Sequence, residues 1–262
     1  MCARTPLPFC WCVISVALGC SNSTAEDIVT AIQFSGFWTA AGATVSNTPS
    51  PPREGTLGGD GGSLFQLKHP GHKDTYVSIG IFGSVDVAKE EFRNECVRIN
   101  IAPNPDPVNF GDEMKNWLRG DHGGGAILYR RGNVFVHIVW FGSKEEGLAF
   151  AKAIDDILVG NHTFVSKGAF ASLPKIAGLP PFIEITKGET KTINVTFEGL
   201  GNGTPSVSID SPGYLTNTII PDGTTKITLS ATAENLNERT VQIRAVSATA
   251  VTAKADLLVK PK

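Results

Sequence analysis

The apolar side chains of this 262-residue chain follow a helical period in two stretches. In the first, after Ser84, they recur every three or four residues and form one face (Val85, Ala88, Phe92, Cys96 and Ile99). The second begins at Ser143, which makes a capping-box pattern with Glu146. Its apolar stripe is Leu148, Ala151, Ile154 and Leu158. The spacing therefore predicts two amphipathic helices.

Short β-rich runs surround these helices. Runs at 64–68 and 76–82 precede the first helix, and two more flank Arg131-Gly132-Asn133, where glycine and asparagine can supply the positive φ of a hairpin turn. The run after this turn is apolar on both faces, which indicates a central strand covered on both sides. Together with a first structured segment at 28–46, these elements predict an α+β domain over 28–165, an antiparallel sheet with two helices.

From Phe182 to Lys260 the period is two throughout. Seven short alternating runs are separated by glycine, proline and asparagine turns, which predicts an all-β sandwich over 182–262. The stretch 166–181 has three prolines and two glycines, so we expect a linker there.

Two motifs in this last region resemble those of bacterial immunoglobulin-like modules. Gly188-Glu189 is followed by Ile193 and Val195, a G-E-x-x-x-I-x-V strand, and Ile220-Pro221 opens an I-P-x-G-x-x-x-x-x-L-x-A hairpin. The resemblance implies an immunoglobulin-like sandwich. It implies no activity, because such modules serve as spacers, docking platforms and adhesive units.

The N-terminus carries an export signal. Arg4 is followed by an apolar run of eleven residues ending at Gly19, too short for a span, which needs about 20. The sequence Ala17-Leu18-Gly19-Cys20 resembles a bacterial lipoprotein signal. The resemblance implies a signal peptide at 1–19, a lipid on Cys20, a tether at 20–27 and a place in the cell envelope. Secretion as a soluble or periplasmic protein stays open, because Ala17 and Gly19 also suit ordinary signal peptidase.

The net charge argues against a nucleic-acid partner, and the cysteine content argues against disulfide bonds. The net charge of −2 provides no field that would gather nucleic acid. Removal of the signal peptide leaves only Cys20 and Cys96, so the chain has no disulfide framework.

One cluster of residues is a weak candidate for a metal site. His69, His72 and Asp74 include ligand types that hold zinc, but a Pro-Gly turn separates the two histidines. A solvated surface turn is the simpler interpretation. We predict no metal and no cofactor.

Three other motifs have structural interpretations that we prefer. Cys96 could be a nucleophile beside His122 or His137, but its place in the apolar stripe predicts burial. Asp112-Glu113 could act as acid and base, but charges at a helix start explain them as well. The glycine-rich loop 121–125 precedes a strand, whereas phosphate-binding loops follow one.

No catalytic set can be assembled from these motifs, so the sequence favours a non-enzymatic envelope lipoprotein with a binding or structural role. We expect it to contact the membrane through the lipid on Cys20, and another envelope protein or a polysaccharide. One alternative is an exported hydrolase with a site in loops 47–63, 69–74 and 120–125. Another is a small-ligand-binding protein with a cleft between sheet and helices.

Overall fold

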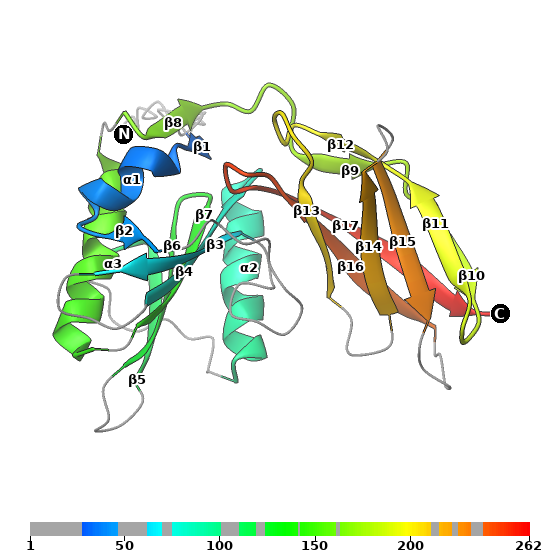
Figure 1. Cartoon of the computed structure of the whole chain (residues 1–262), viewed down its shortest axis with the longest axis horizontal. Helices are drawn as coiled ribbons and strands as arrows, with labels where there is room; N and C mark the ends of the chain where they lie inside the picture. The colour runs from blue at the N-terminus through cyan, green and yellow to red at the C-terminus, as the bar shows by residue number, and fades with distance from the viewer. Residues whose placement is uncertain are drawn as a thin grey trace, which may run out of the picture.

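A computed structural model shows the fold of the chain (Figure 1). The structure describes residues 28–46, 62–69, 75–100, 110–118, 124–140, 142–160, 163–210, 215–221, 225–231 and 238–262. The predicted signal peptide, Cys20, the tether and most of the loop 47–63 lie outside these residues.

The first part of the chain is mixed α/β. Its elements are β1 (Ile28–Ile32), α1 (Phe34–Ala40), β2 (Thr44–Val45), β3 (Ser63–Lys68), β4 (Thr75–Phe82), α2 (Val85–Arg98), β5 (Glu113–Leu118), β6 (Gly125–Arg131), β7 (Val134–Trp140), α3 (Lys144–Val159) and β8 (Val165–Gly168). Antiparallel pairing gives the strand order β2-β3-β4-β7-β6-β5. A separate two-stranded sheet joins β1 to β8.

Helices cover both faces of this sheet. Ala88, Phe92 and Cys96 of α2 pack on one face against Phe82, Leu128 and Phe135. On the other face, α1 and α3 share a larger core with Val77, Ile79, Val136 and Ile138. The side chains of β7 therefore meet a helix layer on each side, as the apolar pattern predicted.

Both predicted helices are confirmed, including their first turns. The Ser84 hydroxyl accepts a hydrogen bond from the Val87 N–H, and Ser143 forms a capping box with Glu146. The structure adds α1, which lies in the segment at 28–46 whose apolar residues showed no clean period.

Two local predictions were wrong. Asp112-Glu113 does not start a helix, because Glu113 begins strand β5 and pairs in register with Arg130 of β6. In the hairpin turn only Gly132 has positive φ, at +54°. Asn133 instead uses its buried side-chain amide, which bonds both Val29 N–H and Val29 O on β1 and also Phe82 O.

The second part of the described chain is all β. Its strands are β9 (Lys175–Ala177), β10 (Phe182–Ile185), β11 (Thr190–Asn194), β12 (Thr196–Glu198), β13 (Ser206–Asp210), β14 (Leu215–Pro221), β15 (Thr225–Ala231), β16 (Arg239–Val246) and β17 (Val251–Pro261). Strands β13, β16, β17 and β10 form one layer, and β11, β15 and β14 another. Their buried residues, among them Ile185, Ile227, Leu229, Val241 and Leu257, form one core.

The stretch expected to be a linker contains regular structure. Strand β8 covers its first three residues, and β9 pairs with β12. Between them, partly buried Phe170 packs against the cores of both parts.

The two parts share a sheet, which the sequence did not predict. Val251 and Thr252 at the start of β17 pair in parallel with Ile81 and Phe82 at the end of β4. The Ile81 N–H also donates to Ala250 O at 2.7 Å. One ten-stranded sheet therefore runs through both parts, as Figure 1 shows where β17 approaches β4.

A turn of the second part enters the core of the first. Ala250, in the β16–β17 connection, is fully buried among the residues of the α1/α3 core. Its φ of +69° is left-handed, a conformation that costs an alanine about 1–2 kcal/mol. Burial of the methyl group in the neighbouring core explains why alanine occupies a position that glycine would adopt more readily.

A buried ion cluster lies beside this junction. Glu91 of α2 is 1% exposed, and its Oε1 lies 2.7 Å from Nη2 of Arg244 on β16. Its Oε2 also contacts Nζ of Lys254 on β17, and this ammonium lies 5.3 Å from the Phe82 ring centroid. One carboxylate of the first part thus binds two cations of the second.

We predict that Glu91→Gln lowers the free energy of unfolding by about 3–5 kcal/mol, because it leaves two buried cations without a counter-charge. Denaturant unfolding of the purified protein measures this loss. Glu238→Gln is the matched control, because Glu238 is exposed and 4.0 Å from Lys260, so its loss should stay below about 1 kcal/mol. Equal losses in the two variants would contradict a special role for Glu91.

Candidate functional site

The three weak candidates for metal ligands are only partly described. His69 follows β3 directly, whereas His72 and Asp74 lie outside the described residues, as does His122. Among the residues that the structure describes, no group of three or more His, Cys, Asp or Glu side chains could hold a metal ion. None of the described helices is long and apolar enough to cross a membrane.

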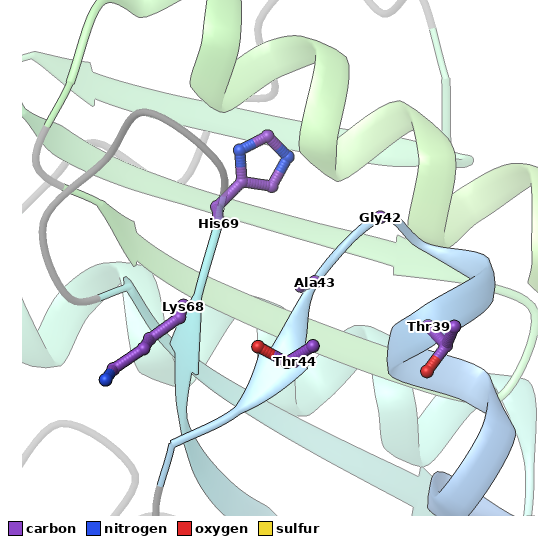
Figure 2. Close-up of a pocket in the computed structure, with 6 residues that line it drawn as sticks. All are labelled: Thr39, Gly42, Ala43, Thr44, Lys68 and His69. Carbon is purple, nitrogen blue, oxygen red and sulfur yellow. The ribbon is translucent and has the colours of Figure 1, made fainter.

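His69 lines a hollow of about 360 Å³ at the edge of the sheet (Figure 2). The hollow lies where α1 ends and β2 pairs with β3, and its described lining is Thr39, Gly42, Ala43, Thr44, Lys68 and His69. Sequence reasoning identified only His69, because its neighbours come from the segment without a clean period.

Backbone pairing holds the walls of this hollow. The Gly42 N–H donates to Thr39 O and the Ala43 N–H to Trp38 O, which fixes the turn after α1. Thr44 then pairs with Lys68 across β2 and β3. The His69 ring packs edge-on against Phe150 of α3, with ring centroids 5.3 Å apart.

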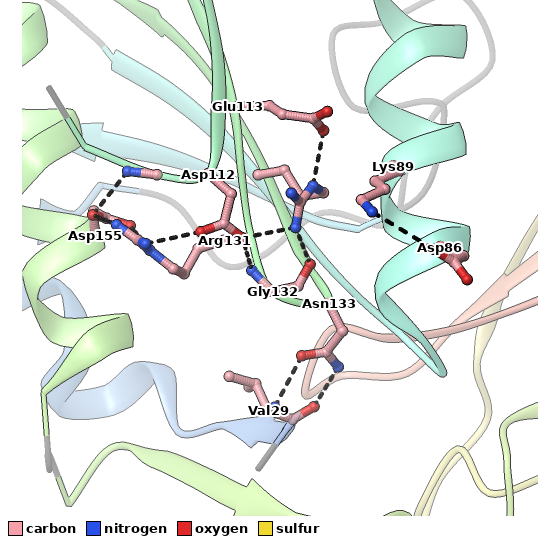
Figure 3. A network of polar contacts seen from close by, with 11 residues as sticks. Val29, Asp86, Lys89, Asp112, Glu113, Arg131, Gly132, Asn133 and Asp155 are labelled. Atoms are coloured by element: carbon pink, nitrogen blue, oxygen red, sulfur yellow. Dashed lines mark hydrogen bonds and ion pairs between the residues drawn. The ribbon is translucent and has the colours of Figure 1, made fainter. Parts of the chain in front are cut away.

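Asp112 and Glu113, which we considered as an acid–base pair, belong to an arginine network (Figure 3). Arg130, 4% exposed, bonds Glu113 through Nε at 2.9 Å and Asp112 through Nη1 at 2.8 Å. Arg131 donates to Asp112 and to the buried Asp155 of α3, and its hydrogen bonds to Asp155 raise the pKa of this guanidinium. These carboxylates tie β5, the β6–β7 hairpin and α3 together, which is a structural task.

A buried histidine–glutamate pair lies under α2, and sequence reasoning missed it. His137 Nδ1 is 3.0 Å from Glu95 Oε1, and the two side chains are 3% and 2% exposed. Glu95 also accepts two hydrogen bonds from Arg98. Burial raises the pKa of Glu95, but the bonds from Arg98 and His137 outweigh it, so the pKa lies well below its ordinary value of 4.5.

His137 has a serine beside it, but the recess that the two share has no room for a substrate. Ser78 lies directly opposite His137 in the β4–β7 register, and His137 Nε2 has no hydrogen-bond partner among the described residues. The recess that Ser78 and His137 share with Leu64, Tyr76 and Val139 cannot hold even one water molecule. Hydrolysis needs both water and substrate, so the geometry favours an interior structural pair.

The prediction that Cys96 is buried is confirmed. Its side chain is fully buried on α2, in the cluster that contains Phe92 and Leu128. A reactive thiolate needs an exposed, polar setting, which this position lacks.

Comparison with known proteins gives little further information. No family model matches the chain, and no curated protein matches it. A complex of titin with the obscurin-like 1 immunoglobulin domain is similar at 20% identity and a TM-score of 0.25, covering 34% of this chain and 92% of that one. A titin I-band fragment is similar at 9% identity and a TM-score of 0.23, covering 84% of this chain and 65% of that one. These are distant matches and identify no family.

The depressed pKa of Glu95 predicts acid-sensitive stability. A carboxyl group with a lowered folded-state pKa stabilises the fold above its ordinary pKa, and this contribution is lost as the pH falls below about 4.5. We expect Glu95→Gln to cost about 1–3 kcal/mol at pH 7 and progressively less toward pH 3. Denaturant unfolding at several pH values measures the difference, with the exposed Glu184→Gln as control. A cost that does not change with pH would contradict this account.

The burial of Cys96 predicts that its thiol reacts slowly with reagents in the native protein. In a protein made as residues 20–262 with Cys20→Ala, Cys96 is the remaining thiol. It should resist a thiol reagent in the native state and react fully in denaturant, as followed by mass spectrometry. Cys96→Ser should cost about 1–3 kcal/mol, because a hydroxyl group is poorly accommodated in an apolar core. Rapid labelling of the native protein would show that the sheet does not cover this thiol of α2.

Proposed function

We propose that the protein is a non-enzymatic lipoprotein of the cell envelope with a binding or structural role. In this proposal Cys20 carries the lipid, and the second part is an immunoglobulin-like module. The observation that carries the proposal is the junction between the parts, where β4 pairs with β17 and Glu91 binds Arg244 and Lys254.

The junction supports a rigid protein. Domains within a chain usually move relative to one another unless their interface is large and well packed, and many enzymes use such motion to close over a substrate. Here a continuous sheet crosses the junction, and separation would expose the buried Glu91 carboxylate. A fixed arrangement suits a protein that holds a binding surface at a set distance from the membrane.

The use of buried charge supports the same role. Arg130, Glu91 and Asp155 are each almost fully buried, and each binds opposite charges on a different element. Charged groups in active sites are instead directed at a cleft that admits substrate. The partner that we propose is another envelope protein or a polysaccharide, and the net charge of −2 gives no reason to expect nucleic acid.

Cell fractionation and intact mass test the anchor. We expect the wild-type protein in the membrane fraction, with a mass equal to residues 20–262 plus acyl groups. Cys20→Ala should lose the lipid and move to the soluble fraction, since one lipid group supplies the attachment. Cys96→Ala is the matched control and should keep both. A wild-type protein without acyl groups would contradict the anchor and would favour secretion as a soluble or periplasmic protein.

Assays with ester, phosphate and glycoside substrates test the non-enzymatic part of the proposal. We expect no turnover by the wild-type protein. Turnover that disappears in His137→Gln, with the fold intact by circular dichroism, would instead assign catalysis to the pair under α2.

A further inference from the structure

We propose that the hollow beside His69 binds a small anionic ligand. This inference rests on the binding role proposed above and specifies one ligand for it. It begins from the residues that line a space of about 360 Å³, which include Lys68, His69 and two threonines.

The size of the hollow suits a small molecule. Small-molecule sites in proteins have volumes of about 300–1,000 Å³. A second hollow shares His69 with Trp140, Glu146 and Phe150, but its volume is only about 10 Å³. Of these two hollows, the one beside α1 and β2 is therefore the one with room for a ligand that contacts His69.

Gly42 lies beside His69 in the wall of the hollow. A Cβ atom at position 42 would lie 3.9 Å from His69 Nε2, which is an ordinary contact distance, so the turn after α1 passes close to this nitrogen. Gly42 has φ of +80°, a conformation that other residues rarely adopt. The turn is held by its hydrogen bonds to Thr39 O and Trp38 O, so this wall is formed before any ligand arrives.

The chemistry of the lining favours an anion. Thr39 and Thr44 offer hydroxyl donors, Lys68 offers an ammonium group, and none of the six described lining residues is acidic. Figure 2 shows His69 directed toward α3 and Lys68 extending away on the other side of β3. The flexible four-carbon stem of Lys68 lets its charge follow a ligand held at His69 and Thr39. Carboxylates and phosphates share the acceptor oxygens that such donors bind.

A titration followed by NMR of the isotope-labelled mature protein tests the proposal, with inorganic phosphate, succinate and glucose as probes. We expect saturable shifts at the amides of Gly42, Ala43 and His69 with phosphate or succinate, and none with glucose. Comparison of the two affinities shows whether the site prefers a phosphate or a carboxylate.

Variants locate the binding. Lys68→Gln and His69→Gln should each weaken it at least tenfold, and Thr44→Val should weaken it less. Lys152→Gln is the matched control, because Lys152 is an exposed lysine that pairs with Asp156 on α3, and it should change nothing. Unchanged melting temperatures show that the variants fold.

Several results would overturn the inference. These are the absence of saturable shifts with both anions, glucose binding as strong as anion binding, and anion binding that Lys68→Gln leaves intact. Such a failure is distinct from failure of the proposed function, because membrane attachment through Cys20 is read by fractionation and does not depend on this hollow.

Discussion

The architecture depends on one buried negative charge. Glu91 lies on the face of α2 that packs against the sheet, where an unpaired carboxylate would cost several kcal/mol in desolvation. Arg244 and Lys254 neutralise it, and both belong to strands more than 150 positions later in the chain. The first part therefore depends on the second for the compensation of its own buried charge. Because this constraint is electrostatic and also geometric, it fixes where β16 and β17 lie relative to α2.

The sequence was informative wherever structure follows local spacing. The stripe that contains Phe92 and Cys96 defined α2, the pair Ser143 and Glu146 defined the start of α3, and alternation after Phe182 located the strands of the second part. Each of these signals depends on residues a few positions apart. The pairing of β17 with β4 has no such signal, because a two-residue parallel ladder leaves no period in the sequence.

The polar residues of the interior were less predictable for the same reason. Glu95 and His137 lie on different elements, and no local spacing in the sequence pairs them. Asp112 and Glu113 resembled helix-start charges until β6 supplied Arg130 as their partner. At the hollow, His69 was recognisable as a ligand type, but Thr39 and Gly42 become its neighbours only through the chain's return after α1.

The burial of Ala250 makes folding of the first part depend on residues much later in the chain. The core under α1 and α3 includes Ala250 from the β16–β17 connection, so that core is incomplete until this hairpin is in place. Contacts between such distant positions slow folding, because a long loop must close before they form. A premature stop that removed β17 would thus damage the N-terminal half of the molecule, although every residue of that half would still be present.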